Sequence, residues 1–181
     1  VDNATISTWQ IEKIAKIFIT NPDEGWKMLK NWDVNYVVIF VSGEKFSTGV
    51  ENEFLYVLGA GGDESKLPWF MKIAGIPFQN YMNLDGRSAN YNFYNETFLG
   101  KMIPFSILGY ANLETGEEFE NWVDGTVQVS AKDIKYNSEN DPLQLVYSSS
   151  SFTNNIAGPM DAVLVYKINE NYSPQVYPIQ K

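Results

Sequence analysis

The chain has 181 residues, of which 44% are hydrophobic and 15% aromatic, so it can bury the core of one compact domain. It contains no histidine and no cysteine, which excludes Ser-His-Asp and Cys-His catalytic sites and removes the usual ligands of zinc. Its formal net charge of -9 repels phosphate backbones. We therefore expect no nucleic-acid partner and no metal site in this chain.

The first predicted elements are two helices that lead into a strand. Apolar residues at helical spacing predict a helix over residues 8–19. The stripe consists of Ile11, Ile14, Ala15 and Phe18. Asn21 followed by Pro22 is typical of a helix start, and this second helix should reach about residue 31. The apolar run over residues 36–41 lacks alternation and predicts a strand covered on both faces.

A glycine-rich stretch predicts a hinge before the next helix. That helix has an acidic start at Asp63, which we expect to cap it, and it should stop at Gly75. Pro68 lacks a backbone N–H donor and cannot sit in a regular helix interior. The helix therefore either starts near Leu67 or is kinked directly after Lys66.

The rest of the chain changes from a loop and a short helix to strands. Residues 81–94 are rich in Asn, Tyr and Gly and predict an ordered loop, followed by a short helix within 96–105. Strand-like runs separated by turn residues cover 125–130, 143–147 and 162–168.

Together these patterns predict a mixed α/β fold in a single globular domain over residues 1–181. Residues 1–110 should form a helix-rich core, with N-terminal helices around a buried central strand. Residues 111–181 should form a strand-rich part.

Other patterns carry only weak signals of a binding site. The glycines of residues 59–62 lack both the Gly-Lys-Ser/Thr of a phosphate loop and the spacing of a dinucleotide fingerprint. The acidic cluster does not have the spacing of an EF-hand and is typical of a solvated loop. It comprises Glu114, Glu117, Glu118 and Glu120. Asn3 and Asn95 begin N-glycosylation acceptor patterns, whose use stays open.

Asp63 and Lys66 form an Asp-x-x-Lys motif at the entrance of the helix that follows the glycines. The simplest interpretation is a helix cap with a local ion pair, which at a surface contributes at most ~1 kcal/mol. A second interpretation comes from a family resemblance.

Three segments resemble the catalytic subunit of oligosaccharyltransferase, the enzyme of protein N-glycosylation. Residues 31–40 read NWDVNYVVIF and look like the family's "(L)DVDYVLVIF" strand. Residues 61–73 are similar to its "GGDxxKxxWMxRI" segment, and residues 2–5 resemble its upstream "DNNT" stretch. The three segments follow the family order within about residues 1–75, and the strand-rich ending is similar to archaeal members.

In that family a multi-pass membrane part carries the lipid-linked donor site and a divalent metal, Mn²⁺ or Mg²⁺. A globular C-terminal domain lies on the extracytoplasmic side of the membrane. The resemblance implies that this chain is such a C-terminal domain, without the transmembrane part. The catalytic residues, the metal and the family's Trp-Trp-Asp-Tyr-Gly motif would then all lie outside the chain.

The resemblance also implies which residues form a site. The family motif Asp-x-x-Lys-x-x-x-Met/Ile lies on a kinked helix beside the pocket for the Ser/Thr of the acceptor, and Asp63 and Lys66 match it. Its third position falls on Phe70, with Met71 one residue later. Residues one apart on a helix differ by about 100° in direction, so either Phe70 or Met71 should face the pocket.

The activity implied for the full enzyme is transfer of an oligosaccharide from a dolichol phosphate-type carrier to the asparagine of Asn-X-Ser/Thr. Its partners would be the acceptor polypeptide and, through the membrane part, the lipid-linked oligosaccharide. The isolated domain should be inactive. The alternative is a secreted carbohydrate-binding or adhesive module that uses the tyrosine-rich loop 81–94 without catalysis.

Overall fold

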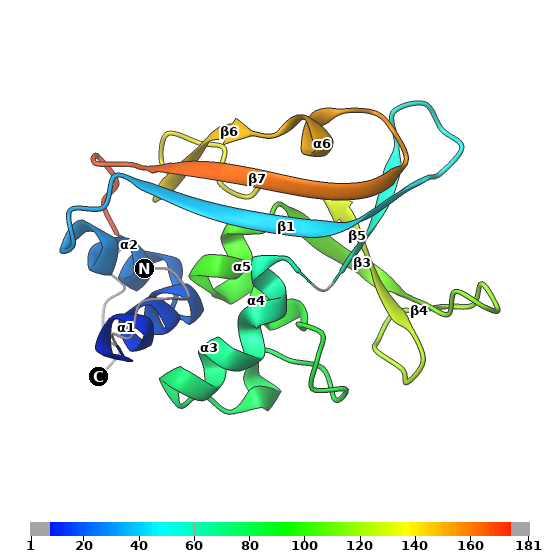
Figure 1. Ribbon diagram of the computed structural model, residues 1–181, viewed down its shortest axis with the longest axis horizontal. Coiled ribbons are helices and arrows are strands. Elements are labelled where there is room, and N and C mark those ends of the chain that lie inside the picture. Colours follow the sequence, from blue (N-terminus) through cyan, green and yellow to red (C-terminus); the bar gives the residue numbers. More distant parts are fainter. Residues whose placement is uncertain (1–7, 60, 175–181) are drawn as a thin grey trace, which may run out of the picture.

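The computed structural model describes residues 8–59 and 61–174 (Figure 1). The segment at residues 2–5, with the Asn3 acceptor pattern, lies outside the described residues. The fold is mixed α/β, as predicted, with helices against one antiparallel sheet of seven strands. The strand order is β4-β3-β5-β2-β1-β7-β6.

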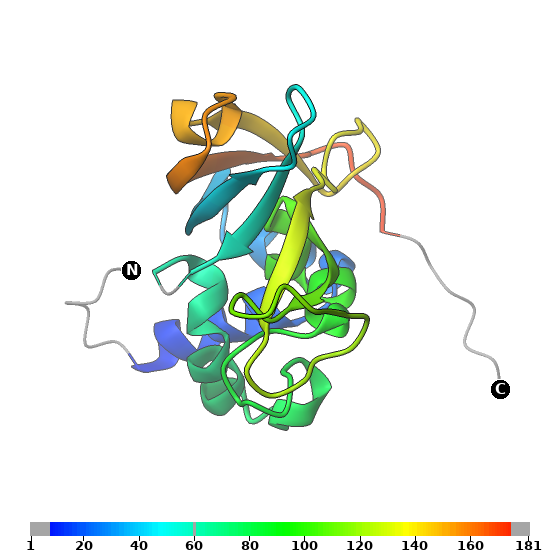
Figure 2. The same cartoon turned by 90° about the vertical axis from the view of Figure 1, so that its right-hand side faces the viewer.

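The elements have the following bounds. The strands are β1 Tyr36–Ser47, β2 Phe54–Leu58, β3 Phe105–Ala111, β4 Glu118–Phe119, β5 Val127–Lys132, β6 Leu143–Ser148 and β7 Gly158–Ile168. The α-helices are α1 Thr8–Ile19, α2 Pro22–Lys30, α3 Leu67–Ala74, α4 Tyr91–Glu96, α5 Phe98–Met102 and α6 Ser150–Thr153. Two short 3-10 helices are η1 Asp63–Lys66 and η2 Phe78–Asn80. Helices α1 to α5 gather on one side of the sheet in both views (Figures 1 and 2).

The two N-terminal helices form where the sequence predicts them. The Asn21 side chain caps α2 by accepting a hydrogen bond from the Glu24 N–H at 3.0 Å. The buried stripe of α1 was predicted less well, because Ile11 is 36% exposed while Ile17 and Ile19 are buried. The helix contacts α2, α3 and α5, and these three neighbours together determine which of its residues are buried.

The prediction that the strand at residues 36–41 is covered on both faces is wrong. This strand, β1, is central in the sheet, and Val37, Ile39 and Val41 are buried under the helices. Tyr36 and Val38 point the other way and are 54% and 60% exposed. The reason is that the helices cover one face of the sheet only, whereas burial of both faces requires layers on both sides.

Most helices lie before residue 110, whereas strands lie on both sides of it. The C-terminal part is rich in strands and contains only the one-turn helix α6 among its described residues. The N-terminal part contributes β1, β2 and β3, of which β2 and β3 were not predicted. The predicted helix within 96–105 ends at Met102, and Pro104 leads directly into β3.

The buried core lies between the helices and the inner face of the sheet, and it draws on both parts of the chain. Tyr166 of β7 donates a hydrogen bond to the Met102 carbonyl at 2.6 Å, which joins the sheet to the end of α5. Thr97 is fully buried between α4 and α5. Its hydroxyl accepts the Gly100 N–H at 3.0 Å and donates to the Phe93 carbonyl at 2.8 Å.

A partly buried lysine holds the corner where α5 turns into β3. The Nζ atom of Lys135 donates to the carbonyls of Gly100, Ile103 and Phe105 at 3.2, 2.7 and 2.6 Å. Burial lowers the pKa of Lys135 to about 8.

Over residues 8–59 and 61–174, no helix has the length and apolar character needed to cross a membrane.

Candidate functional site

The Asp-x-x-Lys motif forms the 3-10 helix η1, and α3 follows it directly. The α-helical hydrogen bonding begins at Leu67, with Pro68 in the first turn, where a missing N–H donor is tolerated. The helix stops at Gly75, whose φ of 72° is left-handed. The predicted start near Leu67 and the predicted stop at Gly75 are both confirmed.

Asp63 joins η1 to the central strand. Its Oδ2 accepts a hydrogen bond from the Phe40 N–H at 2.7 Å, and its Oδ1 lies 2.7 Å from Nζ of Lys66. The pairing of β1 with β2 ends at Gly43, so the carboxylate takes the place that a neighbouring strand would occupy at Phe40. Neither η1 nor α3 has a side-chain cap, and the expectation that Asp63 caps the helix is therefore wrong.

The ion pair leaves Lys66 at the surface. The side chains of Lys66 and Asp63 are 55% and 17% exposed, so Asp63 is held in place while the ammonium group faces solvent. An anchored carboxylate beside an exposed cation can orient a hydroxyl or a carbonyl of a bound polypeptide.

The two candidates for the apolar contact point in different directions, as their spacing requires. Met71 is fully buried in the core. Phe70 is half-buried at the contact of α3 with α1, where its ring centroid lies 5.4 Å from that of Phe18. Of the two side chains, Phe70 is the partly exposed one, and it follows Lys66 by four residues.

Glu64, the residue after Asp63, is a buried carboxyl that the sequence analysis did not single out. It is 8% exposed, and no other described residue donates a hydrogen bond to either carboxyl oxygen. Desolvation raises the pKa of Glu64 to about 8; the residue's own backbone N–H opposes this shift, the charge of Asp63 adds to it, and Lys66 lowers it slightly. An acidic residue at a helix start usually indicates solvent exposure, so the sequence carries no signal of this burial.

Glu64 lines a pocket of about 300 Å³ beside the loop 81–94. Tyr94 and Gln128 also line it, and the Gln128 amide donates to the Tyr94 hydroxyl at 3.2 Å. Asp85 closes a turn of the loop by accepting the N–H groups of Arg87 and Ser88 at 2.8 and 3.0 Å. The prediction of an ordered loop is confirmed up to Asn90, which caps α4.

The tyrosines of this loop do not share one surface. Tyr94 is buried, Tyr81 packs partly against the core, and Tyr91 is 39% exposed. A sugar-stacking platform made from the three rings is therefore not assembled in this conformation.

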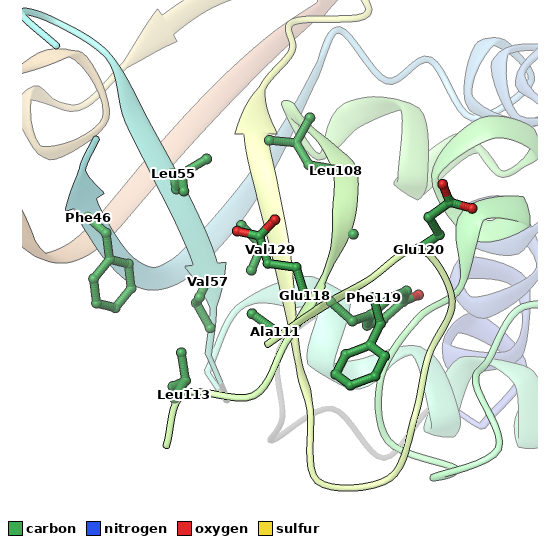
Figure 3. A pocket seen from close by; sticks show the side chains of 12 residues that line it. Phe46, Leu55, Val57, Leu108, Ala111, Leu113, Glu118, Phe119, Glu120 and Val129 are labelled. Carbon is green, nitrogen blue, oxygen red and sulfur yellow. The ribbon is translucent and has the colours of Figure 1, made fainter. Parts of the chain in front are cut away.

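A larger groove, of about 520 Å³, lies on the outer face of the sheet (Figure 3). Its apolar side chains come from β1, β2, β5 and the β3–β4 hairpin, and they include Phe46, Leu55, Val57, Leu108, Phe119 and Val129. Glu118 and Glu120 are its charged lining residues. Neither Asp63 nor Lys66 lines either of these two cavities.

No three His, Cys, Asp or Glu side chains within residues 8–59 and 61–174 converge as metal ligands would. The chain matches no protein-family model and no curated protein sequence.

Proposed function

We propose that this chain is the C-terminal, extracytoplasmic domain of an archaeal-type oligosaccharyltransferase catalytic subunit. The full enzyme would transfer oligosaccharide from a dolichol phosphate-type carrier to Asn in Asn-X-Ser/Thr. The observation that carries the proposal is the hydrogen bond between Phe40 N–H and Asp63. It joins in space the two best resembling segments, residues 31–40 and 61–73, which are separate in the sequence.

The chemistry fits a role in positioning the acceptor. An amide nitrogen is a poor nucleophile, so an enzyme that glycosylates asparagine must hold it against the donor and the metal. Selection of Ser or Thr two residues later needs a polar contact for the hydroxyl and an apolar contact for the methyl group. Lys66 with Asp63 would supply the first contact, and Phe70 the second.

The remaining parts of the reaction belong to the membrane part in this proposal. Mn²⁺ or Mg²⁺, the lipid-linked oligosaccharide and the Trp-Trp-Asp-Tyr-Gly motif would all reside there. The acceptor pocket would form only when that part lies against η1, which agrees with the position of Asp63 and Lys66 outside the two cavities described above.

Lys66→Ala in the full-length enzyme tests the proposal. We expect transfer to an acceptor peptide to fall at least tenfold, about 1.4 kcal/mol of transition-state stabilisation, with little change in Tm. Lys72→Ala is the matched control, because Lys72 is an exposed lysine of the following helix α3. Full activity of a normally folded Lys66→Ala enzyme would reduce the motif to a surface ion pair.

Phe70→Ala tests the apolar contact. We expect it to weaken threonine acceptors relative to serine acceptors by roughly 1 kcal/mol, the contribution of one buried methyl group. Met71→Ala should instead lower the stability of the domain, because Met71 is fully buried. Kinetics with paired Asn-X-Thr and Asn-X-Ser peptides measure the difference.

A second candidate is a carbohydrate-binding or adhesive module without catalysis. The apolar groove of Figure 3 favours it, since Phe119 and Phe46 line an open surface that a ligand can reach. A glycan-array signal from this chain that Phe119→Ala abolishes, and that Tyr147→Ala on the same sheet face retains, would support this candidate.

A further inference from the structure

The pocket beside the loop 81–94 is lined by η1, α4, β2, β5 and the loop itself. Glu64 comes from η1, Tyr94 from α4 and Gln128 from β5. Val57 and Leu58 of β2 form an apolar part of its wall. The loop adds Asp85, Arg87, Ser88 and Ala89, so the pocket is assembled from several separate parts of the chain.

The unusual feature of this pocket is the state of the Glu64 carboxyl group. More than nine-tenths of the residue is buried, and no other described residue donates a hydrogen bond to its two buried carboxyl oxygens. Buried polar side chains almost always have a hydrogen-bond partner, because an unpaired group loses its hydration without compensation. Asp63, one residue earlier, has both oxygens paired.

The charged groups around Glu64 do not neutralise it. On its own element, Lys66 is engaged with Asp63. From the loop, Asp85 adds a second carboxylate that is already bonded to backbone N–H groups, and Arg87 lies exposed at the pocket lining. Tyr94 contributes a neutral hydroxyl. No salt bridge within the described residues includes Glu64.

We propose that this pocket binds a ligand through a primary ammonium group that pairs with the carboxylate of Glu64. An ionised carboxylate only accepts hydrogen bonds, and an ammonium group supplies three donors together with the compensating charge. The net charge of -9 also favours the approach of a cation. This inference does not rest on the proposed function.

Binding should release a proton. The pKa of Glu64 is about 8, so near neutral pH the empty pocket holds the protonated carboxylic acid. When the ammonium ligand enters with its own proton in place, the proton of Glu64 passes to the buffer and the carboxylate pairs with the cation. The reaction takes up one charged ligand and releases about one proton per site near pH 7.

Calorimetric titration with n-butylammonium chloride tests the proposal. Near pH 7 the apparent enthalpy should differ between phosphate and Tris buffers, which differ in ionisation enthalpy, and the difference should vanish well above the pKa of Glu64. Neutral n-butanol should not bind. No binding of the ammonium probe at tens of millimolar, equal binding of butanol, or enthalpies independent of the buffer would each overturn the proposal.

Substitutions locate the site. Glu64→Gln should weaken n-butylammonium at least tenfold and abolish proton release, whereas Glu53→Gln, in the exposed hairpin between β1 and β2, should change neither. Unchanged affinity of Glu64→Gln would refute the assignment. Comparison of n-butylammonium with Nα-acetyl-lysine amide distinguishes a free amine from a lysine side chain of a polypeptide as the source of the ammonium group.

Discussion

The two faces of the sheet carry similar apolar side chains, but one face is covered by the helices and the other is exposed. On β7, Leu164 is fully buried under the helices, while its neighbour Val163 points outward and is 38% exposed. On β1, Ile39 and Val38 show the same contrast. Apolar composition therefore does not decide which strand residues are buried. The position of the helices decides it, and the outer face is left free to form surfaces such as the groove of Figure 3.

The contrast predicts very different costs for two adjacent substitutions. Leu164→Ala should lower the free energy of unfolding by about 2–5 kcal/mol, because it leaves a cavity in the packed inner face. Val163→Ala should lower it by less than about 1 kcal/mol. Urea denaturation of both variants measures the difference. Equal losses would mean that the outer face is covered by another part of the protein.

The inner face also depends on one polar group. Lys135→Met keeps most of the side-chain volume but leaves the three carbonyls at the corner between α5 and β3 without this donor. We expect a loss of about 3 kcal/mol, since each unpaired buried carbonyl carries a desolvation cost. Lys101→Met, at a partly buried position of α5, is the control. A neutral effect of Lys135→Met would show that water replaces the ammonium group.

The stability of the domain should pass through a minimum near pH 8. The folded state keeps the proton of Glu64 from about pH 4.5 to 8 while the unfolded state has lost it, so stability falls over that range. The unfolded state keeps the proton of Lys135 from about pH 8 to 10.5 while the folded state has lost it, so stability then rises. The lowered pKa values of Lys45 and Lys132 act in the same direction as that of Lys135.

Glu64→Gln isolates the falling part of this profile. We expect it to remove the decrease below pH 8 and to raise the stability near pH 8 by about 2 kcal/mol. The rise above pH 8 should remain. Thermal melts at a series of pH values for the wild type, Glu64→Gln and Glu53→Gln give the comparison. A falling part that persists in Glu64→Gln would assign it to other groups.

The smallest effect should come from the exposed ion pairs. Lys66→Ala removes the pair with Asp63 but leaves the bond from Phe40 to Asp63, so stability should fall by less than about 1 kcal/mol. Lys27→Ala, which removes the more exposed pair with Glu24, should have an effect no larger than this. A much larger loss of stability for Lys66→Ala would show that Lys66 is needed for the folded state, and it would weaken the case for a binding role.

The features predicted correctly from the sequence depend on local chemistry. The cap of α2 at Asn21, the break at Pro68 and the stop at Gly75 each follow from properties of one residue and its neighbours. The strands β5, β6 and β7 were predicted from apolar runs bounded by turn residues.

The features that were missed depend on distant parts of the chain. Strands β2 and β3 gain their hydrogen bonds from pairings with β1 and β5 that the local sequence does not encode. The burial of Glu64 requires α4 and β5 to close the pocket around it. The Asp-x-x-Lys motif was found from its residues, but the bond of Asp63 to β1 follows only from the fold.

The position of Thr97 determines when a glycosylating enzyme can recognise the acceptor pattern that begins at Asn95. Asn95 is exposed, but the hydroxyl of Thr97, two residues later, is buried and engaged at both ends in hydrogen bonds that hold α4 and α5 together. An enzyme that recognises this hydroxyl has access to it only before the domain closes, or during its transient opening. A glycan on Asn95 would thus indicate that the sugar was transferred before this part of the domain had folded or while it was transiently open.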